Sequence, residues 1–220
     1  MNRPNRFIAE VEISGERQTV HVKNTGRCRE LLVEGCRVWL EKSDNPSRKT
    51  EYDLVCVEKQ RVDKEPLVIN MDSQVVNDVA EEWLSSGGLF STDAKIRREV
   101  KYKNSRFDFY VEEGDRKVFL EVKGVTLEND GVASFPDAPT ERGIKHINEL
   151  ISAVKDGYEA YILFVIAMKG VTRFEPNDIT HKAFGDALRN AAENGVNIIA
   201  MDCLVTPDAI IIDKNVEISL

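Results

Sequence analysis

Two acidic residues and a lysine are the strongest candidates for chemistry in this chain. Glu121 and Lys123 form a Glu-x-Lys triplet, and Asp108 lies thirteen residues before the glutamate. Between them, residues 112–116 (Glu-Glu-Gly-Asp-Arg) predict a tight turn that joins two antiparallel strands. A loop centred in this turn places Asp108 directly opposite Glu121. Lys123 then lies on the same face, because side chains alternate with period two along a strand.

This pairing of like charges calls for an explanation. Two carboxylates directly opposite each other destabilise a sheet by up to about 1 kcal/mol. A divalent cation between them removes the repulsion, and Mg²⁺ is commonly held by one or two carboxylates, waters and a substrate phosphate. Lys123 could then orient an attacking water and offset charge on the phosphoryl group. The pattern predicts a metal-dependent phosphodiesterase site, with Asp108 and Glu121 as ligands of Mg²⁺ or Mn²⁺ and Lys123 as a further catalytic group.

The simpler alternative is a solvated hairpin face with scattered charges. Glu-x-Lys triplets arise by chance, and residues 99–101 (Glu-Val-Lys) form a second one. Three features favour the site: the opposed carboxylate, the basic start of the following helix, and a continuous apolar face behind the charges. The same register pairs Phe107 with Val122, Phe109 with Leu120 and Val111 with Val118 on the apolar face, and Arg106 with Lys123 on the charged one.

The helix predicted over residues 139–156 begins with basic side chains. Arg142 and Lys145 are one turn apart and His146 lies beside them, so they and the N-terminal amides of the helix could hold a phosphate. The alternative is a solvated helix start with a half-buried His146. Asp137, in the rigid stretch just before the helix, could cap the helix or serve the site.

A second basic group lies near the N-terminus. On an OB barrel, a loop of this kind contacts backbone phosphates while aromatic side chains stack on bases. Trp39 is the best stacking candidate and Tyr52 is another, whereas Phe7 falls on the apolar face of its strand, which favours core packing. The basic group consists of His21, Lys23, Asn24, Thr25, Gly26, Arg27 and Arg29.

Short strands dominate the first seventy residues. Residues 6–13 and 17–22 alternate around a Ser-Gly-Glu turn, which predicts a hairpin. Five strands with an inserted helix predict an OB-type β-barrel over residues 1–71, with a plain β-meander as the alternative. The remaining elements expected here are strands over 36–42, 51–58 and 67–71, and a turn with a short helical stretch over 24–33.

From residue 72 onward, long helical patterns alternate with strands, which predicts a mixed α/β domain over residues 72–220. The order is αβββαβ, followed by a further helix and strands. Ser73 is the expected N-cap of the first helix, which ends at a Gly-Gly pair. The expected helices are 73–85, 139–156 and 178–193, and the expected strands are 95–102, 106–112, 117–122, 160–168, 196–204 and 209–212.

Composition excludes several classes of protein. The 220 residues are 42% hydrophobic and 31% charged, which excludes a disordered chain. No apolar run is close to the length of about 20 residues that a membrane-spanning helix needs, and no signal-type segment follows the start. A cytoplasmic protein without membrane contact is therefore expected. The four cysteines are spaced unlike zinc ligands or a CxxC pair and are expected to be reduced structural thiols. The sequence contains no GxSxG or GxxxxGK[ST] motif, which excludes hydrolase-fold esterases and P-loop enzymes.

The charge is unevenly distributed. A net charge of −8 argues against a uniformly basic nucleic-acid binder. However, residues 1–62 carry a net charge of +2 and the remainder −10, and residues 95–106 hold six Lys or Arg against a single Glu. The chain therefore keeps local basic surfaces that could contact nucleic acid.

Six stretches of the chain together resemble the bacterial sugar fermentation stimulation protein (SfsA) family. They agree in order and spacing with that family and extend from the N-terminus to the second helix of the second domain. They are residues 3–7 (RPNRF), 21–28 (HVKNTGRC), 105–109 (SRFDF), 121–126 (EVKGVT), 135–138 (FPDA) and 140–143 (TERG).

The resemblance implies an N-terminal OB-like domain and a C-terminal domain similar to the PD-(D/E)xK nuclease fold. It also implies non-specific DNA binding and a regulatory role in sugar metabolism, notably that of maltose. In the nuclease-like pattern, Asp108, Glu121 and Lys123 fall on the metal and catalytic positions, and Glu81 or Glu82 of the first helix would complete them. The family name describes a phenotype and not a reaction.

Three functions are therefore open. The leading one is a cytoplasmic protein that binds DNA, or RNA, and hydrolyses phosphodiester bonds with Mg²⁺ or Mn²⁺. The second is a non-catalytic, non-specific DNA-binding regulator of sugar (maltose) metabolism genes, and the third is binding of a phosphorylated metabolite or a protein partner. Exposed sheet edges would permit a dimer. In the first two functions the nucleic-acid contacts are His21, Lys23, Asn24, Arg27, Arg106, Arg142, Lys145 and His146.

Overall fold

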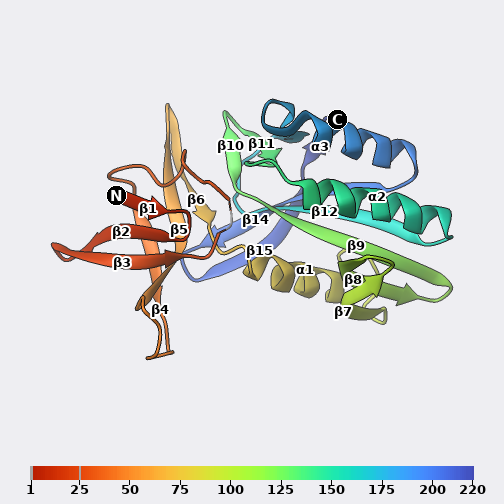
Figure 1. Ribbon diagram of the computed structural model, residues 1–220, viewed down its shortest axis with the longest axis horizontal. Coiled ribbons are helices and arrows are strands. Elements are labelled where there is room, and N and C mark those ends of the chain that lie inside the picture. Colours follow the sequence, from red (N-terminus) through yellow and green to blue (C-terminus); the bar gives the residue numbers. More distant parts are fainter. Residues whose placement is uncertain (1, 25) are drawn as a thin grey trace.

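A computed structural model describes residues 2–24 and 26–220 of the chain. Figure 1 shows a strand-rich N-terminal part and a larger part in which helices lie on both sides of a sheet. The N-terminal sheet has the strand order β1-β2-β3-β5-β4, with β6 paired to β5. Its strands are β1 (Asn2–Asn5), β2 (Ile8–Ile13), β3 (Glu16–Val22), β4 (Val38–Lys42), β5 (Tyr52–Arg61) and β6 (Lys64–Asn70).

Strand β5 organises the N-terminal sheet. It pairs parallel with β3 and antiparallel with β4 on opposite edges of its first half, and antiparallel with β6 along its second half. The hairpin of β2 and β3 follows the predicted alternation, because Ala9, Val11 and Val20 are buried on one face. This curled sheet agrees with the OB-type architecture expected from the sequence.

Three predictions in this part are wrong, the first being the number of strands, because β1 was not among the five expected. Residues 24–33 were expected to include a short helical stretch, but outside Thr25, which lies beyond the described residues, they form turns with one helix-like bond from the Leu32 amide to the Cys28 carbonyl (3.1 Å). Phe7 was expected in the core and is 39% exposed, with the guanidinium of Arg6 over its ring. Phe7 precedes the first residue of β2, so the alternation of that strand does not fix its side chain.

The second sheet has the strand order β15-β14-β12-β9-β8-β7. Its centre is parallel, because β12 pairs parallel with both β9 and β14, and the outer pairs are antiparallel. Helices cover both faces of β12, which accounts for its almost uninterrupted apolar sequence. The strands are β7 (Lys95–Tyr102), β8 (Ser105–Glu113), β9 (Arg116–Val125), β12 (Glu159–Ile166), β14 (Asn197–Thr206) and β15 (Ala209–Asn215).

Three helices sandwich this sheet (Figure 1). Helix α1 (Val75–Ser85) buries Val76, Val79 and Leu84 in one hydrophobic cluster on its side of the sheet. Helices α2 (Glu141–Lys155) and α3 (Asp178–Glu193) contribute Ile147, Leu150, Phe184 and Leu188 to the cluster on the other face. The mixed α/β fold predicted for the second part of the chain is confirmed.

The helix boundaries agree with the sequence to within two residues, and both α1 and α2 begin two residues later than expected. Ser73 was expected to cap α1, but the N-cap residue is Gln74 and its side chain makes no capping bond. The Ser73 hydroxyl instead donates to the backbone carbonyl of Lys23 (2.8 Å). The residue therefore fastens the N-terminal part to the start of α1, a long-range contact that local patterns do not reveal.

A small third sheet, in the order β10-β11-β13-β16, was not predicted. Its strands have too few residues for a periodic pattern to emerge. It contributes to the junction of the two parts, because Glu128 on β10 forms a buried ion pair with Lys59 of β5 (2.6 Å). No helix within the described ranges is long and apolar enough to cross a membrane. The four strands are β10 (Leu127–Asn129), β11 (Val132–Phe135), β13 (Arg173–Pro176) and β16 (Glu217–Ile218).

Candidate functional site

The hairpin of β8 and β9 carries the predicted acids at the centre of the second sheet. Its register pairs Phe109 with Leu120 and Glu113 with Arg116, which is the register that the turn predicts. Because β9 also pairs with β12, the residues after Leu120 lie inside the sheet and not at its edge. Glu121 is consequently only 3% exposed.

The predicted continuous apolar face of this hairpin is wrong at one residue. Phe109 packs in the cluster on the α1 side, whereas Phe107 lies on the other face against the rings of Tyr102 and Phe119. The alternation breaks at Asp108, whose side-chain Oδ2 accepts a bond from the backbone amide of Val122 (2.8 Å). The Asp108 side chain thus accepts a hydrogen bond that a backbone carbonyl of the paired strand would otherwise accept.

Asp108 is held from two sides. Besides the amide of Val122, the side-chain Nδ2 of Asn77 on α1 donates to Oδ1 (2.9 Å). Burial, and next the negative charge of Glu121, raise the pKa of Asp108 above its ordinary value. The two acids therefore repel each other within one site, as the sequence predicts.

Glu121 uses only one of its two carboxylate oxygens. Oε1 contacts both the Nζ of Lys123 and the Nδ1 of His146. Burial favours the neutral form, but Lys123 and His146 together outweigh it and hold the pKa of Glu121 below its ordinary value. Oε2 is buried and has no hydrogen-bond partner among the described residues. An unpartnered buried carboxylate oxygen is unfavourable, and a bound cation would satisfy it.

His146 orients the glutamate and does not face a solvent-exposed phosphate. The ring is 6% exposed, and its Nε2 lies 3.4 Å from the Nε of Arg142, one turn earlier on α2. Since a guanidinium can only donate, Nε2 accepts, and in the neutral ring Nδ1 carries the proton that Glu121 accepts. The predicted half-buried histidine is thus a fully engaged one that holds Glu121 in place.

The two acids border an open cavity of about 330 Å³ next to the start of α2. Lys123 and Arg142 contribute positive charge to its walls, and Thr140 caps the helix by accepting from the amide of Gly143 (3.0 Å). Asp137, which was expected to cap this helix or serve the site, does not cap it and instead accepts from the Arg27 amide of the N-terminal part (2.7 Å).

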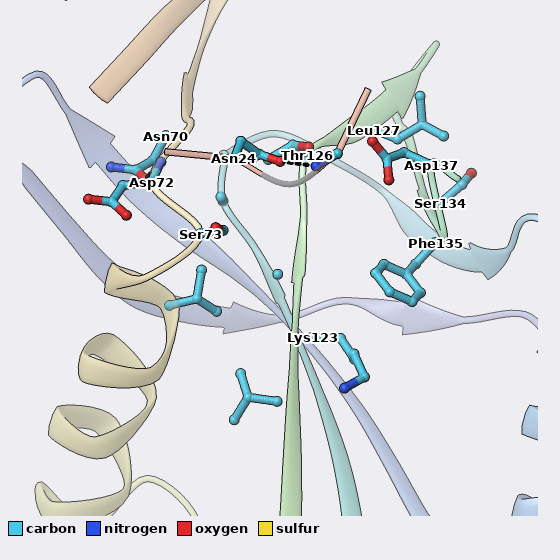
Figure 2. A pocket seen from close by; sticks show the side chains of 15 residues that line it. Asn24, Asn70, Asp72, Ser73, Lys123, Thr126, Leu127, Ser134, Phe135 and Asp137 are labelled. Atoms are coloured by element: carbon cyan, nitrogen blue, oxygen red, sulfur yellow. Dashed lines mark hydrogen bonds between the residues drawn. The ribbon is translucent and has the colours of Figure 1, made fainter. Parts of the chain in front are cut away.

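A second cavity, of about 220 Å³, adjoins the first at the junction of the two parts. Lys123 and Phe135 line both cavities. Figure 2 shows this second cavity, with Asn24 and Asp72 on one side, Phe135 and Asp137 on the other, and Lys123 at its far end. A groove therefore leads from the acidic pair toward the N-terminal part.

The structure does not bring a third acid from α1 to the site. Oε2 of Glu81 lies 3.2 Å from Nη1 of Arg98. Glu82 lines a different cavity, on the other side of the helix. The helix contributes Asn77 instead. Within residues 2–24 and 26–220, no group of three His, Cys, Asp or Glu side chains has the arrangement of a metal site. The residues present fit a cation held by Asp108 and Glu121 with waters, as Mg²⁺ commonly is.

The basic residues of the N-terminal loop are largely engaged in internal contacts. His21 binds Asp53 (2.9 Å), and Lys23 binds Asp72 (2.9 Å). Asn24 is buried and donates to the carbonyl of Met71 (3.1 Å). Arg27 and Arg29 keep exposed side chains, and Thr25 lies outside the described residues. Of the four predicted contact residues here, the side chain of Arg27 is the one that remains available.

The other predicted cations surround the turn between β7 and β8. Arg106 is exposed and lies 3.5 Å from Glu99, so it does not share a site with Lys123 as the simple register predicted. Lys145 donates to the backbone carbonyl of Asn104 in that turn (2.8 Å). Trp39 is half-buried, with Arg37 over its ring.

Sequence reasoning missed Asn77, which lies in an ordinary helical pattern without any distinguishing signal.

Comparisons with known proteins now identify the family. The model of the sugar fermentation stimulation protein RE domain matches residues 74–209, and that of the SfsA N-terminal OB domain matches residues 1–68. The chain belongs to the SfsA family. The N-terminal OB domain expected from the resemblance is thereby confirmed.

Relatives in this family match almost the whole chain. A sugar fermentation stimulation protein homolog of Clostridium beijerinckii is 58% identical over 218 residues, covering 99% of this chain and 94% of that protein. A homolog of Ruminiclostridium cellulolyticum is 54% identical over 220 residues, covering 100% and 95%. Among solved structures, that of Pyrococcus furiosus SfsA in complex with Ca²⁺ matches with a TM-score of 0.85 and 26% identity, covering 100% of this chain and 94% of that one.

Proposed function

We propose that this protein binds DNA in the cytoplasm and hydrolyses phosphodiester bonds with a divalent cation held by Asp108 and Glu121. The observation that carries the proposal is the buried, unpartnered Oε2 of Glu121 beside the half-buried carboxylate of Asp108 at an open cavity. The solved relative in complex with Ca²⁺ supports a divalent cation. Two carboxylates with room for waters suit Mg²⁺ or Mn²⁺.

Each residue of the site has a distinct role in this proposal. Asp108 and Glu121 would hold the cation, which when bound would act as a Lewis acid and lower the pKa of water. The ammonium group of Lys123 orients the attacking water and offsets charge on the phosphoryl oxygens. The planar guanidinium of Arg142 binds a non-bridging phosphate oxygen. His146 positions Glu121 through its ring Nδ1.

The N-terminal domain supplies the grip on the nucleic acid. OB domains bind oligonucleotides through their loops and strand faces, and the exposed Arg27 lies where the loop meets Asp137 of the second domain. Trp39 is the proposed stacking residue. Cys28, Cys36, Cys56 and Cys203 are all free, in keeping with a reducing cytoplasm.

The test is a cleavage assay on the purified full chain with Mg²⁺, Mn²⁺ or Ca²⁺. Single- and double-stranded DNA and RNA are offered as substrates. We expect cleavage by the parent protein and its loss in Asp108→Ala and Glu121→Ala. Glu112→Ala serves as the matched control, because it removes an acid from β8, the strand of Asp108, outside the cavity. We expect this variant to keep its activity. Equal cleavage by all four proteins would refute the assignment.

A second candidate function is DNA binding without cleavage, as a regulator of sugar-metabolism genes. The OB domain favours it, because such domains bind nucleic acid without any catalysis. It predicts binding that weakens as salt rises, no cleavage with any cation, and little change in binding on Lys123→Ala. Loss of DNA affinity on Arg27→Ala is expected for both functions, and unchanged affinity would favour a phosphorylated metabolite or a protein partner.

A further inference from the structure

A third cavity, which is polar and separate from Asp108 and Glu121, opens at the turn between β7 and β8. Its volume is about 380 Å³, and it lies against the first turn of α2. The turn itself is tight, with Lys103 in the left-handed backbone region (φ 47°). The residues that line the cavity are Glu99, Lys101, Asn104, Ser105, Arg106 and Arg142.

Positive charge in this cavity is concentrated and poorly compensated. Lys101 and Arg106 are direct partners across the β7–β8 pair, and Arg142 faces them from α2. Glu99 approaches Arg106 at 3.5 Å. Over the described ranges, neither Lys101 nor Arg142 forms an ion pair with a carboxylate. Like charges directly opposite each other destabilise a sheet, and Glu99 at Arg106 compensates the three cations only in part.

A further polar group nearby lacks a partner. The hydroxyl of Ser105, a residue that lines the cavity and is 7% exposed, makes no hydrogen bond with any described residue. Two guanidinium groups, an ammonium and a hydroxyl are the donors that bind the oxygens of a phosphate, the guanidinium groups in bidentate fashion. An anion with several acceptor oxygens would satisfy all of them together.

We propose that this cavity is a phosphate subsite for the nucleic-acid strand, distinct from the phosphate at the carboxylates. The inference rests on the proposed function, because the strand is the substrate proposed there. Arg142 lines both cavities, and Ser105 precedes Asp108 by three residues on β8, about 10 Å of extended strand. A phosphate in this subsite therefore belongs to a nucleotide close to the cleaved bond.

The subsite makes the substrate class more specific. A nucleic-acid strand contacts both cavities only when, besides the phosphate of the cleaved bond, it carries another phosphate close to that bond on one side. This phosphate is either the terminal phosphate of a strand end or an internal phosphodiester. A terminal phosphate would direct cleavage to strand ends, whereas an internal one would direct it along the strand.

The test measures binding of short single-stranded DNA to the full chain in EDTA, where cleavage does not occur. Fluorescent oligonucleotides with and without a 5′-phosphate are compared. Lys101→Ala and Arg106→Ala are each expected to weaken binding of the phosphorylated strand about tenfold, as loss of a hydrogen bond to a charged group does. Lys117→Ala, which removes an exposed lysine at the other end of the β8–β9 hairpin, is the control and should change binding less than twofold.

The outcomes separate the two sources of phosphate and the two proposals. A loss confined to the phosphorylated strand identifies a terminal phosphate, and a similar loss for both strands identifies an internal one. Equal effects of Lys101→Ala and Lys117→Ala, or no effect of either cavity variant, would overturn the subsite. Binding with the expected losses but no cleavage in Mg²⁺ or Mn²⁺ would refute the proposed hydrolysis and leave the subsite standing.

Discussion

Each domain of the molecule contains a buried carboxylate in contact with a histidine and a lysine. In the N-terminal domain, Asp53 binds His21 (2.9 Å) and lies 3.6 Å from Lys23. Both of its oxygens also accept bonds from the guanidinium of Arg48. Arg48 first, and then His21 and Lys23, lower the pKa of Asp53 to about 2 although burial opposes them. Every acceptor of Asp53 is occupied.

The corresponding cluster in the second domain is built differently. Glu121 contacts His146 and Lys123, but its third neighbour is the carboxylate of Asp108, where Asp53 has a guanidinium. The result is an unpartnered oxygen on Glu121 and a raised pKa on Asp108. The same side-chain types thus form a closed structural network in one domain, and in the other a site that lacks one positive charge.

The largest expected difference between the two clusters is in catalysis. Glu121→Gln should reduce the rate of DNA cleavage at least about a hundredfold, because it removes charge that holds the cation at the reacting phosphate. Asp53→Asn should leave the rate within about twofold, since that cluster only supports the fold. Initial rates on a single-stranded DNA substrate in Mg²⁺ measure both. Equal losses in the two variants would abolish the distinction.

The reverse order is expected for stability. Asp53→Asn should lower the free energy of unfolding by about 2 to 3 kcal/mol, because it leaves three cationic or polar donors without their charged partner. Urea unfolding followed by fluorescence of the two tryptophans measures the change. Asp44→Asn, at an exposed acid of the same domain, is the control and should change stability by less than about 0.5 kcal/mol. If Asp53→Asn changed the free energy of unfolding as little as Asp44→Asn, the Asp53 network would not contribute to stability.

The Asp53 network should also produce a defined acid dependence. The pKa of Asp53 is about 2 in the folded chain against an ordinary 3.8, so the native state binds fewer protons than the unfolded state. Its contribution of about 2 kcal/mol is present above about pH 5 and is lost as the pH falls toward 2. The difference in unfolding free energy between the parent and Asp53→Asn should shrink over this window, as urea titrations at successive pH values would reveal.

The smallest effect is expected at Asp108. In EDTA, Asp108→Asn should change the free energy of unfolding by less than about 1 kcal/mol, because the relief of repulsion between two carboxylates on neighbouring strands is offset where the amide nitrogen replaces an oxygen that accepts a hydrogen bond. Mg²⁺ should raise the melting temperature of the parent and not of this variant, because a ligand of the native state stabilises it. A loss of stability like that of Asp53→Asn would mean that Asp108 is a structural residue.

Much of the β8–β9 hairpin, which carries the candidate site, could be predicted because its signals are local. The Gly-Asp turn fixes the register of β8 and β9, and the spacing of Glu121 and Lys123 places them on one face. The helices also follow from periodicity and end signals. The side of the sheet on which Phe107 lies could not be predicted, because the contact between Asp108 and the Val122 amide overrides strict alternation.

The sequence by itself determined the longer helices and strands, the register of the β8–β9 hairpin and the family resemblance. The elements and the register could be predicted because they depend on residues that are neighbours along the chain or across one tight turn. The tertiary structure alone decided which charges are already neutralised. Lys23 is taken up by Asp72 and His146 by Glu121, and both contacts join residues at least 25 positions apart. A charge is available for a ligand only if no distant residue has compensated it, and the packing of the whole chain sets those distant contacts.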